Sequence, residues 1–280
     1  MKKIILIMIS AALLLGGCMA NGGTEKSTKN QTTDLPTNVA DTTLEVTEVA
    51  LDYSQYDPSS ITWGPGRISD HTRPMDPMAL QESFAELGGK WLMIDENRIC
   101  LTFDEGYENG YTAQILDTLK EKNVKAFFFC TYDYVRDNPE LVQRMIDEGH
   151  IVGNHSYRHY NFTKIDVATA TEEVTFLHDY MIEKFGYEMK YFRFPEGAFS
   201  EQALALVNSL GYETLFWSFA YADWDTSSPP DPSSAFDLIT SSTHNGAIFL
   251  LHAVSSTNAD ILGNVIDNVR DQGYVFTTDL

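Results

Sequence analysis

The chain has 280 residues, of which 43% are hydrophobic and 12% aromatic, enough to bury the core of one large domain. This composition excludes a chain that is disordered or collagen-like over most of its length. Asp and Glu number 40 against 19 Lys and Arg, and the net charge of −21 repels phosphate groups. We therefore expect no nucleic-acid partner. Three cysteines are too few for a disulfide framework, so a packed core must stabilise the fold.

The first eighteen residues have the pattern of an export signal. A basic start precedes an apolar run over residues 4–15, too short to span a membrane, and two glycines then lead to Cys18. Residues 15–18 resemble the bacterial lipobox, in which the cysteine becomes a lipid-modified N-terminus after cleavage. The alternative is an ordinary signal peptide with a chance cysteine. We expect an exported lipoprotein that Cys18 anchors to the outer face of the cytoplasmic membrane, in the cell wall or spore envelope, with no other membrane contact.

Composition divides the remaining chain into a tether and a domain. Residues 19–60 are rich in Thr, Asn, Ser and acids, and their few aliphatic side chains cannot offset the entropy lost on ordering. Aromatic and aliphatic residues return from residue 61 onward, without a second linker or an internal repeat. We expect a disordered tether over 19–60 and one domain over 61–280. Within that domain, residues 61–98 are expected to form an N-terminal extension that packs on the rest.

Apolar strands alternate with helices over most of this domain. Strands are expected over residues 99–103, 124–130, 151–153, 191–193, 214–219, 247–251 and 274–276. Helices are expected over residues 112–122, 138–149, 166–185, 200–211, 232–240 and 258–270. Capping residues mark several helix starts, and glycines mark several helix ends. Seven strands that alternate with helices predict an α/β fold with a parallel sheet.

Polar side chains stand at the carboxyl ends of five expected strands. They are Asp104, His155, Arg193, Asp223 and His252. In a β/α barrel these strand ends converge on one face, whereas in an open sheet they spread along a crevice. Five such groups meet only if the sheet closes. The segment after the first strand also lacks the glycine spacing of a phosphate-binding loop. We therefore predict a seven-stranded β/α barrel.

Imidazoles and carboxylates give this face the chemistry of metal-assisted hydrolysis. His155 and His159 lie four residues apart, close enough on a helical turn to share a metal ion, and Glu105 supplies an oxygen ligand. Such an ion lowers the pKa of bound water, and Asp104 is expected to accept the proton during attack. We expect one divalent ion, zinc in the first place, although cobalt and others suit the same ligands.

The remaining polar residues complete a hydrolytic site for an amide or an ester. His252 is expected to protonate the leaving nitrogen, with Asp223 orienting the imidazole. Arg193 is expected to keep Asp104 ionised despite partial burial. Each residue also has a structural interpretation, as an ion pair, a solvated turn or a core histidine. Their joint occurrence at the strand ends of one barrel favours the catalytic interpretation.

Five ordered motifs resemble those of carbohydrate esterase family 4, the NodB-homology polysaccharide deacetylases. They are Thr102-Phe103-Asp104-Glu105-Gly106, His155-Ser156-x-x-His159, Arg193-x-Pro195-x-Gly197, Asp223-Trp224 and Leu250-Leu251-His252. The resemblance covers roughly residues 63–280 and implies a distorted seven-stranded β/α barrel. It implies the same roles as above, with Asp104 as general base, Arg193 as its holder, Asp223 and His252 as the acid pair, and His155 and His159 as metal ligands.

The same resemblance implies residues that contact the substrate. The backbone N–H of Glu196 would help to stabilise the oxyanion, and Trp224 and Leu250 would wall the acetyl pocket. Phe194, which stands where the family motif commonly has a proline, is included among the expected substrate-binding residues. Glu105 is one methylene longer than the family's usual Asp.

Further motifs resemble the delta-lactam-biosynthetic branch of the family. They are the runs at residues 106–110, 216–218 and 251–256, with the Asp223-Trp224 pair. That resemblance implies removal of acetyl from N-acetylmuramic acid in peptidoglycan strands, leading to the muramic delta-lactam of the spore cortex. We expect the protein to be a monomer. The alternatives are a deacetylase of N-acetylglucosamine or chitin-like oligomers, and an acetyl xylan esterase. A lipoprotein that binds cell-wall glycan without turnover is the alternative of another class.

Overall fold

The computed structural model describes residues 52–68, 70–94 and 97–280. The expected signal peptide, Cys18 and residues 19–51 of the expected tether lie outside these residues. The last part of the expected tether, residues 53–57, contacts the barrel: a short 3₁₀ helix spans Tyr53–Gln55, and the Tyr53 hydroxyl lies 2.7 Å from Ser209 Oγ. Among the described residues, no helix has the length and apolarity needed to cross a membrane.

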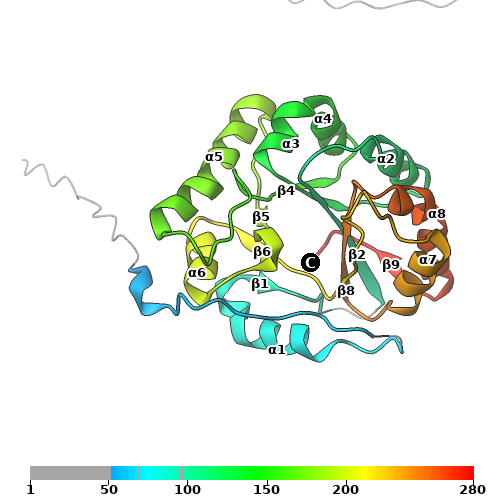
Figure 1. The fold of residues 1–280 in the computed structure, drawn as a ribbon, viewed down its shortest axis with the longest axis horizontal. Coiled ribbons are helices and arrows are strands. Elements are labelled where there is room, and N and C mark those ends of the chain that lie inside the picture. The colour runs from blue at the N-terminus through cyan, green and yellow to red at the C-terminus, as the bar shows by residue number, and fades with distance from the viewer. Residues whose placement is uncertain (1–51, 69, 95–96) are drawn as a thin grey trace, which may run out of the picture. The chain divides into compact units, whose positions relative to one another are not determined.

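A single parallel sheet curls into a barrel, and helices surround it (Figure 1). The strand order is β1-β6-β5-β4-β3-β2-β8-β7, and β9 pairs with the start of β2. The strands are β1 (Gly89–Lys90), β2 (Arg98–Glu105), β3 (Phe127–Cys130), β4 (Ile151–Asn154), β5 (Tyr191–Phe192), β6 (Glu213–Leu215), β7 (Phe219–Ala220), β8 (Ala247–His252) and β9 (Val275–Phe276). The expected α/β barrel fold is confirmed.

One chain segment closes the curl of the sheet. β6 pairs with β5 and with β1, whereas β7, which follows after three residues, pairs with β8. Between them, the Ser218 N–H donates to the Ile248 carbonyl at 2.9 Å. The strand expected over 214–219 is therefore divided in two, which distorts the barrel. Nine strand segments result, because this strand is divided and because β1 adds a strand that the sequence pattern did not indicate.

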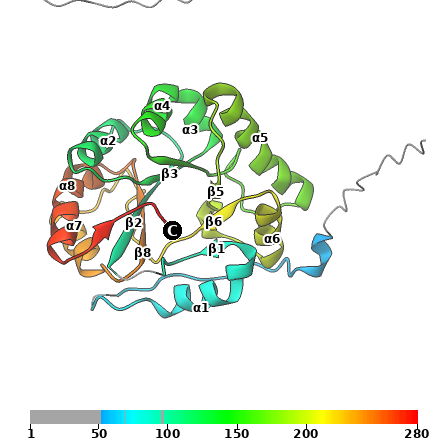
Figure 2. The same ribbon diagram turned by 180° about the vertical axis from the view of Figure 1, so that it is seen from behind.

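The helices lie around the outside of the sheet, and Figure 2 shows them from behind. All six expected helices are present with small shifts at their ends. The helices are α1 (Met75–Phe84), α2 (Thr112–Glu121), α3 (Tyr132–Asp137), α4 (Pro139–Asp147), α5 (Val167–Phe185), α6 (Glu201–Ser209), α7 (Pro232–Ser241) and α8 (Ser256–Asp271). The caps explain the ends: Asp166 accepts from the Thr169 N–H at the start of α5, and Gly186 ends it in a left-handed conformation.

Residues of each strand alternate between the barrel interior and the helix-facing side. Cys100 of β2 belongs to a small apolar cluster inside the barrel, together with Phe127, Phe129 and Ile248. Its neighbour Leu101 belongs to the larger cluster between the sheet and the helices. Thr102 and Asp104 therefore share the interior side with Cys100. Because parallel neighbours are in register, His252 lies directly beside Asp104 on β8.

The extension over residues 61–98 packs on the barrel through aromatic side chains. The Trp63 ring lies 4.8 Å from Trp217 and 5.5 Å from Phe216, between ring centroids, and its indole N–H donates to the Gly197 carbonyl at 2.9 Å. Trp91 is fully buried and stacks on Phe216 at 4.2 Å. The extension thereby stabilises the turn around Gly197, which lines the cavity described next.

Candidate active site

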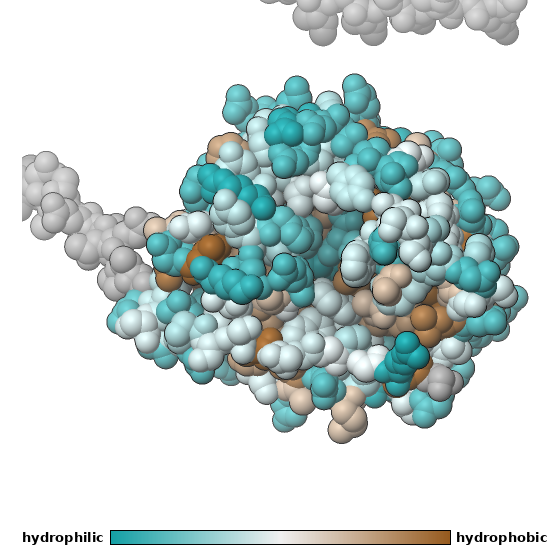
Figure 3. Space-filling view, in the orientation of Figure 1, coloured by the Kyte–Doolittle hydropathy of each residue, from teal (hydrophilic) through white to brown (hydrophobic). Residues whose placement is uncertain are grey.

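The carboxyl ends of the strands surround a cavity of about 690 Å³. Figure 3 shows the hollow at the centre of this face, bordered largely by hydrophilic residues. The residues that line the cavity are Asp104, Gly106, Tyr107, His155, His159, Glu196, Gly197, Trp217, Ala220, Tyr221, Trp224, Leu250, His252 and Val254. Seven of the residues predicted for the site therefore line this cavity. His159 is one of them and lies on the loop that follows β4.

Asp104 and Arg193 form a buried ion pair below the cavity. Arg193 is fully buried, and its Nη1 donates to Asp104 Oδ1 at 2.7 Å and to Thr102 Oγ1 at 2.8 Å. Its other guanidinium N–H groups donate to the Leu215 and Phe216 carbonyls. Burial raises the pKa of Asp104, but the charges of Arg193, His155 and His252 outweigh it, and the net pKa is lowered. Asp104 is therefore an ionised base with one oxygen, Oδ2, still free of Arg193.

Gly153 leaves room for the Phe129 ring, which lies against the Arg193 guanidinium. The Arg193 guanidinium stacks over the Phe129 ring at 4.2 Å. A Cβ at Gly153, on the neighbouring strand, would approach the Phe129 ring to 2.4 Å. Any larger residue at 153 would displace that ring and the guanidinium above it. Gly153 thus positions Arg193, and through it the Asp104 carboxylate.

His155 is buried and held as a neutral imidazole. Its Nδ1 lies 2.9 Å from the Arg193 carbonyl, which can only accept, so Nδ1 carries the proton and Nε2 has a lone pair. Burial lowers the pKa of His155 to about 4, against the opposing charge of Asp104. Nε2 lies 3.5 Å from Asp104 Oδ2. Two acceptors face each other here, an arrangement that suits a cation or a water molecule between them.

His159 is brought to His155 by a bend and not by the helical turn expected from the sequence. The two rings lie 4.9 Å apart, edge to face. Ser156 and His159 both have positive φ, 70° and 58°, and no helix begins before α5. The Ser156 Oγ accepts from the His159 N–H at 3.0 Å and stabilises the bend. The two imidazoles lie side by side as the sequence predicted, but through a different local structure.

The structure does not bring Glu105 to these imidazoles. Glu105 follows Asp104 on β2, so it faces the helices; it is fully buried and does not line the cavity. Neither of its carboxylate oxygens has a hydrogen-bond partner. Burial, with the charges of Glu108 and Asp104, raises its pKa well above the ordinary value, so the carboxyl is held neutral. The prediction of Glu105 as a ligand is corrected by the two-residue period of the strand.

His252 and Asp223 form the second charged pair. Asp223 Oδ1 lies 2.7 Å from His252 Nδ1, and Oδ2 accepts from the His252 backbone N–H at 2.8 Å. Burial lowers the pKa of His252, but the hydrogen bond and charge of Asp223, with the charge of Asp104, raise it overall. His252 is therefore protonated at neutral pH more readily than a free imidazole, as a general acid requires.

Asn258 and Tyr221 extend this pair, and no pattern in the sequence predicted either residue. Asn258 is buried at the start of α8, and its Nδ2 donates to Asp223 Oδ2 at 2.6 Å. Asn258 Oδ1 accepts from the Tyr221 hydroxyl. Every oxygen of the Asp223 carboxylate is thus bonded and fixed in orientation. An Asn in the first turn of a helix gives no signal in one sequence, because that position is equally common in ordinary caps.

The remaining predicted substrate contacts divide into two groups. Glu196, Trp224 and Leu250 line the cavity, and Trp224 is 61% exposed, open to a ligand. Phe194 does not: it is fully buried among Phe162, Phe192 and Phe199, on the helix-facing side. The alternation that turns Arg193 inward turns Phe194 outward. Tyr107, which is 53% exposed at the cavity, was not predicted, since a lone aromatic after a strand carries no distinctive signal.

Comparison with known proteins identifies the family. Residues 94–215 match the polysaccharide deacetylase family. The chain is 39% identical over 218 residues to the Bacillus subtilis peptidoglycan-N-acetylmuramic acid deacetylase PdaA, covering 77% of this chain and 83% of that protein. This chain belongs to the polysaccharide deacetylase family. It is a hydrolase of that family, as the motifs of its sequence implied.

Solved structures agree with this assignment of the deacetylase. The structure of Bacillus subtilis PdaA, a family 4 carbohydrate esterase, matches with a TM-score of 0.75 and 38% identity, over 79% of this chain and 95% of that one. A family 4 carbohydrate esterase from Bacillus anthracis matches with a TM-score of 0.66 and 39% identity, over the same shares. A Listeria monocytogenes peptidoglycan-N-acetylglucosamine deacetylase, PgdA, is 33% identical over 65% of this chain and 38% of its own length.

Family 4 carbohydrate esterases use a divalent metal ion, and the side chains at this cavity fit that requirement in part. His155 and His159 present two imidazoles to the cavity. Among the described residues, however, no group of three or more His, Cys, Asp or Glu side chains is arranged around one ion position. The expected set of Glu105, His155 and His159 does not fit, because Glu105 faces away.

Glu105→Gln is expected to leave kcat and bound metal unchanged, because Gln resembles the neutral carboxyl. The folded chain keeps the Glu105 proton at pH values where the unfolded chain, with a pKa near 4.5, has lost it. Stability therefore falls as pH rises above that value, by at most about 1.4 kcal/mol per pH unit, and the variant escapes this loss. Urea unfolding at pH 5 and pH 8 measures the difference. Loss of metal from the variant would restore Glu105 as a ligand.

Proposed function

We propose that this deacetylase hydrolyses the acetamide of N-acetylmuramic acid in peptidoglycan glycan strands, a reaction that leads to the muramic delta-lactam. The observation that carries the proposal is the pair of opposite catalytic groups, Asp104 with Arg193 and His252 with Asp223, on neighbouring strands at one cavity. The choice of muramic acid is supported by the 39% identity to a protein named for that activity.

Asp104 and His252 divide the proton transfers of amide hydrolysis. Asp104 Oδ2 accepts a proton from the attacking water as its oxygen bonds to the acetyl carbon. The tetrahedral intermediate then collapses, and the His252 Nε2 proton passes to the leaving nitrogen as the carbon–nitrogen bond breaks. The Glu196 backbone N–H is proposed to stabilise the oxyanion, with Trp224 and Leu250 enclosing the methyl group. The products are acetate and the free sugar amine, whose nucleophilic nitrogen can close a lactam.

A zinc ion is the proposed cofactor, with cobalt or another divalent ion as alternatives. His155 and His159 would hold it, and a bound ion polarises a carbonyl and lowers the pKa of water. The neutral state of His155 suits this role, because a ligand imidazole must offer a lone pair. Metal analysis tests the assignment apart from activity: His155→Ala is expected to lose bound zinc.

The pH dependence of kcat/KM is expected to be flat between about pH 4 and 6.5 and to fall above that range. Asp104 has a pKa below its ordinary value of 3.8, so it is already ionised, and His252 has a pKa above 6.5, so it keeps its proton. His252→Ala is expected to lower kcat about 100-fold and to remove the alkaline fall. Acetate release measured from pH 3.5 to 9 checks both. An activity that rises through pH 6.5 would contradict the acid role.

Anchoring by Cys18, export to the cell wall or spore envelope, a role in sporulation and a monomeric state complete the proposal. Peptidoglycan lies outside the cytoplasmic membrane, so a lipid at residue 18 would hold the barrel near its substrate. Labelling with a radioactive fatty acid tests the anchor, since Cys18→Ser is expected to abolish the label. Persistent labelling of that variant would remove Cys18 from the proposal.

Deacetylation of N-acetylglucosamine is the second candidate, because the Listeria relative is named for it. Mass spectrometry of peptide-free glycan strands after incubation separates the two, since the lost acetyl can be assigned to one sugar. Loss from muramic acid supports the proposal. Loss from glucosamine alone would keep the mechanism and change the substrate, and retention of glycan without any loss would indicate a binding protein.

A further inference from the structure

A second cavity adjoins the catalytic cavity. Its volume is about 390 Å³, and it lies between β7, α7 and the N-terminal extension. The residues that line it are Gly66, Arg67, Phe219, Ala220, Tyr221, Ala222, Pro230, Leu238 and Ser242. Ala220 and Tyr221 line both cavities, so the short segment at the end of β7 lies between them. A substituent on a sugar bound in the catalytic cavity would need to extend only beyond this segment to enter the second cavity.

Arg67 is the only Lys or Arg among the residues that line either cavity. It is exposed, and among the described residues no carboxylate forms an ion pair with it. The catalytic cavity carries the carboxylates of Asp104 and Glu196 instead. An anionic group of the substrate that reaches the second cavity would therefore meet the charge of Arg67.

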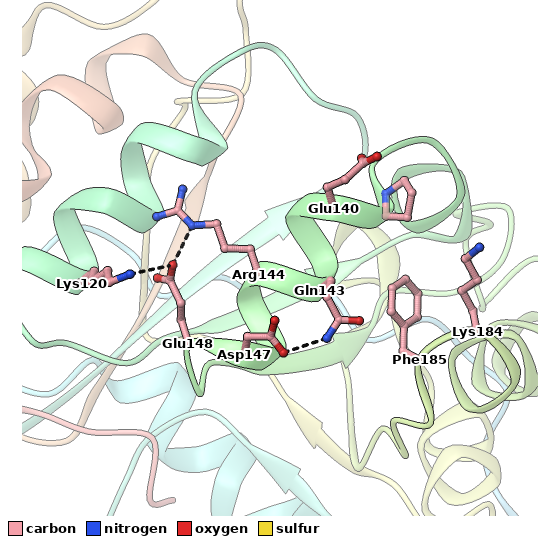
Figure 4. A pocket seen from close by; sticks show the side chains of 9 residues that line it. Lys120, Glu140, Gln143, Arg144, Asp147, Glu148, Lys184 and Phe185 are labelled. Carbon is pink, nitrogen blue, oxygen red and sulfur yellow. Dashed lines mark hydrogen bonds and ion pairs between the residues drawn. The ribbon is translucent and has the colours of Figure 1, made fainter.

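The outer groove between α4 and α5 shows the contrast (Figure 4). Its volume is about 660 Å³, and three of its six charged side chains form ion pairs with one another. Arg144 Nε lies 2.7 Å from Glu148 Oε1, Lys120 Nζ lies 3.6 Å from the same oxygen, and Gln143 donates to Asp147 at 2.8 Å. Lys184 at its edge has no such partner, but it stands in no cavity with the catalytic groups. The ion pairs of this groove form among its own residues.

The wall between the two inner cavities is held in place by the catalytic hydrogen-bond network. The Tyr221 hydroxyl donates to Asn258 Oδ1, and Asn258 in turn donates to Asp223. Asp223 holds His252. The position of the second cavity relative to the general acid is therefore set by a chain of hydrogen bonds, as a specificity pocket requires.

We propose that the second cavity binds the carboxylate of the 3-O-lactyl group of muramic acid, through Arg67. The inference rests on the proposed function and adds the residue that selects the sugar. In muramic acid the lactyl ether is on the ring carbon next to the one that carries the acetamide, so the two groups reach adjacent pockets. The lactyl methyl suits the apolar walls of Phe219 and Leu238, and the guanidinium suits the carboxylate. N-acetylglucosamine has no such group.

The test uses one oligosaccharide in two forms, with the lactyl carboxyl free or converted to the primary amide. Arg67→Gln is expected to raise KM for the free acid about tenfold and to leave kcat and the amide form unchanged. Wild-type protein is expected to show the same tenfold preference for the acid over the amide. Lys184→Gln, which removes an equal charge from the outer groove, is the matched control and is expected to change neither value.

Equal effects of Arg67→Gln on both substrate forms, or none on either, would overturn the assignment. Failure of the proposed function is seen separately, in wild-type protein that releases no acetate from muramic acid. In that case equilibrium dialysis of N-acetylmuramic acid and its amide still decides the question. Weaker binding of the acid to Arg67→Gln supports the site, and unchanged binding contradicts it.

Discussion

Asp104→Asn is expected to lower kcat by about 10⁴-fold, the upper end of the range for loss of a general base. The amide keeps the shape of the carboxylate but cannot accept the proton of the attacking water. It also leaves the Arg193 charge without its counter-ion, 2.7 Å away in a buried position. Acetate release from peptide-free glycan strands measures the loss, and dialysis against the same strands is expected to show that they still bind.

A matched control separates chemistry from folding. Asp117 is an exposed Asp that pairs with Arg144 on the outside of the barrel, so Asp117→Asn makes the same change far from the cavity. It is expected to retain full activity. Turnover of Asp104→Asn within tenfold of the wild type, with the fold intact by circular dichroism, would remove Asp104 from the mechanism.

Arg193→Met is expected to cost about 3–5 kcal/mol of stability, the typical effect of removing one partner of a buried pair. Met fills much of the same volume, so the loss comes from the Asp104 charge that remains without a counter-ion and from the Leu215 and Phe216 carbonyls that lose their donor. In the variant the pKa of Asp104 rises above its unfolded value. The destabilisation is therefore present at neutral pH and is relieved as pH falls through that raised pKa, when the folded chain takes up the proton.

The double variant Arg193→Met with Asp104→Asn gives the decisive comparison. Since both charges are then absent, it is expected to be more stable than Arg193→Met alone at pH 7. Urea unfolding of the four proteins of this cycle measures the coupling. Additive losses would mean that the ion pair contributes nothing beyond the packing of the two side chains.

Sequence pattern predicted the barrel and most of the site for one physical reason. Parallel strands place their carboxyl ends on one face, so polar residues after apolar runs converge whatever their separation along the chain. Asp104, His155, Arg193 and His252 were found in this way. The helices were found because their caps and apolar faces are local signals, as at Asp166 and Gly186.

The misplaced residues share another reason. Glu105 and Phe194 each follow a residue that faces the interior, and the motif alone does not show which of two neighbours points inward. The phase of the strand decides it, and Cys100, Thr102 and Asp104 reveal that phase only once the interior cluster is known. The sequence did not predict helix α1 because Pro77 is its only buried residue, so the helix lacks an apolar stripe. The bend at His159 depends on two residues with positive φ, a conformation that non-glycine residues adopt too rarely to be predicted from the sequence.

The pairing of β2 with β8 has a consequence for when the protein becomes active. Asp104 and His252 are neighbours across strands that are 148 positions apart in the chain, and Arg193 and Asp223 lie between them in sequence. A chain synthesised from its N-terminus cannot complete this pairing until nearly all of it has emerged. In the proposed mechanism, a fragment that ends before β8 has the general base Asp104 but lacks the general acid His252. We therefore expect no hydrolytic activity from any chain that ends before β8.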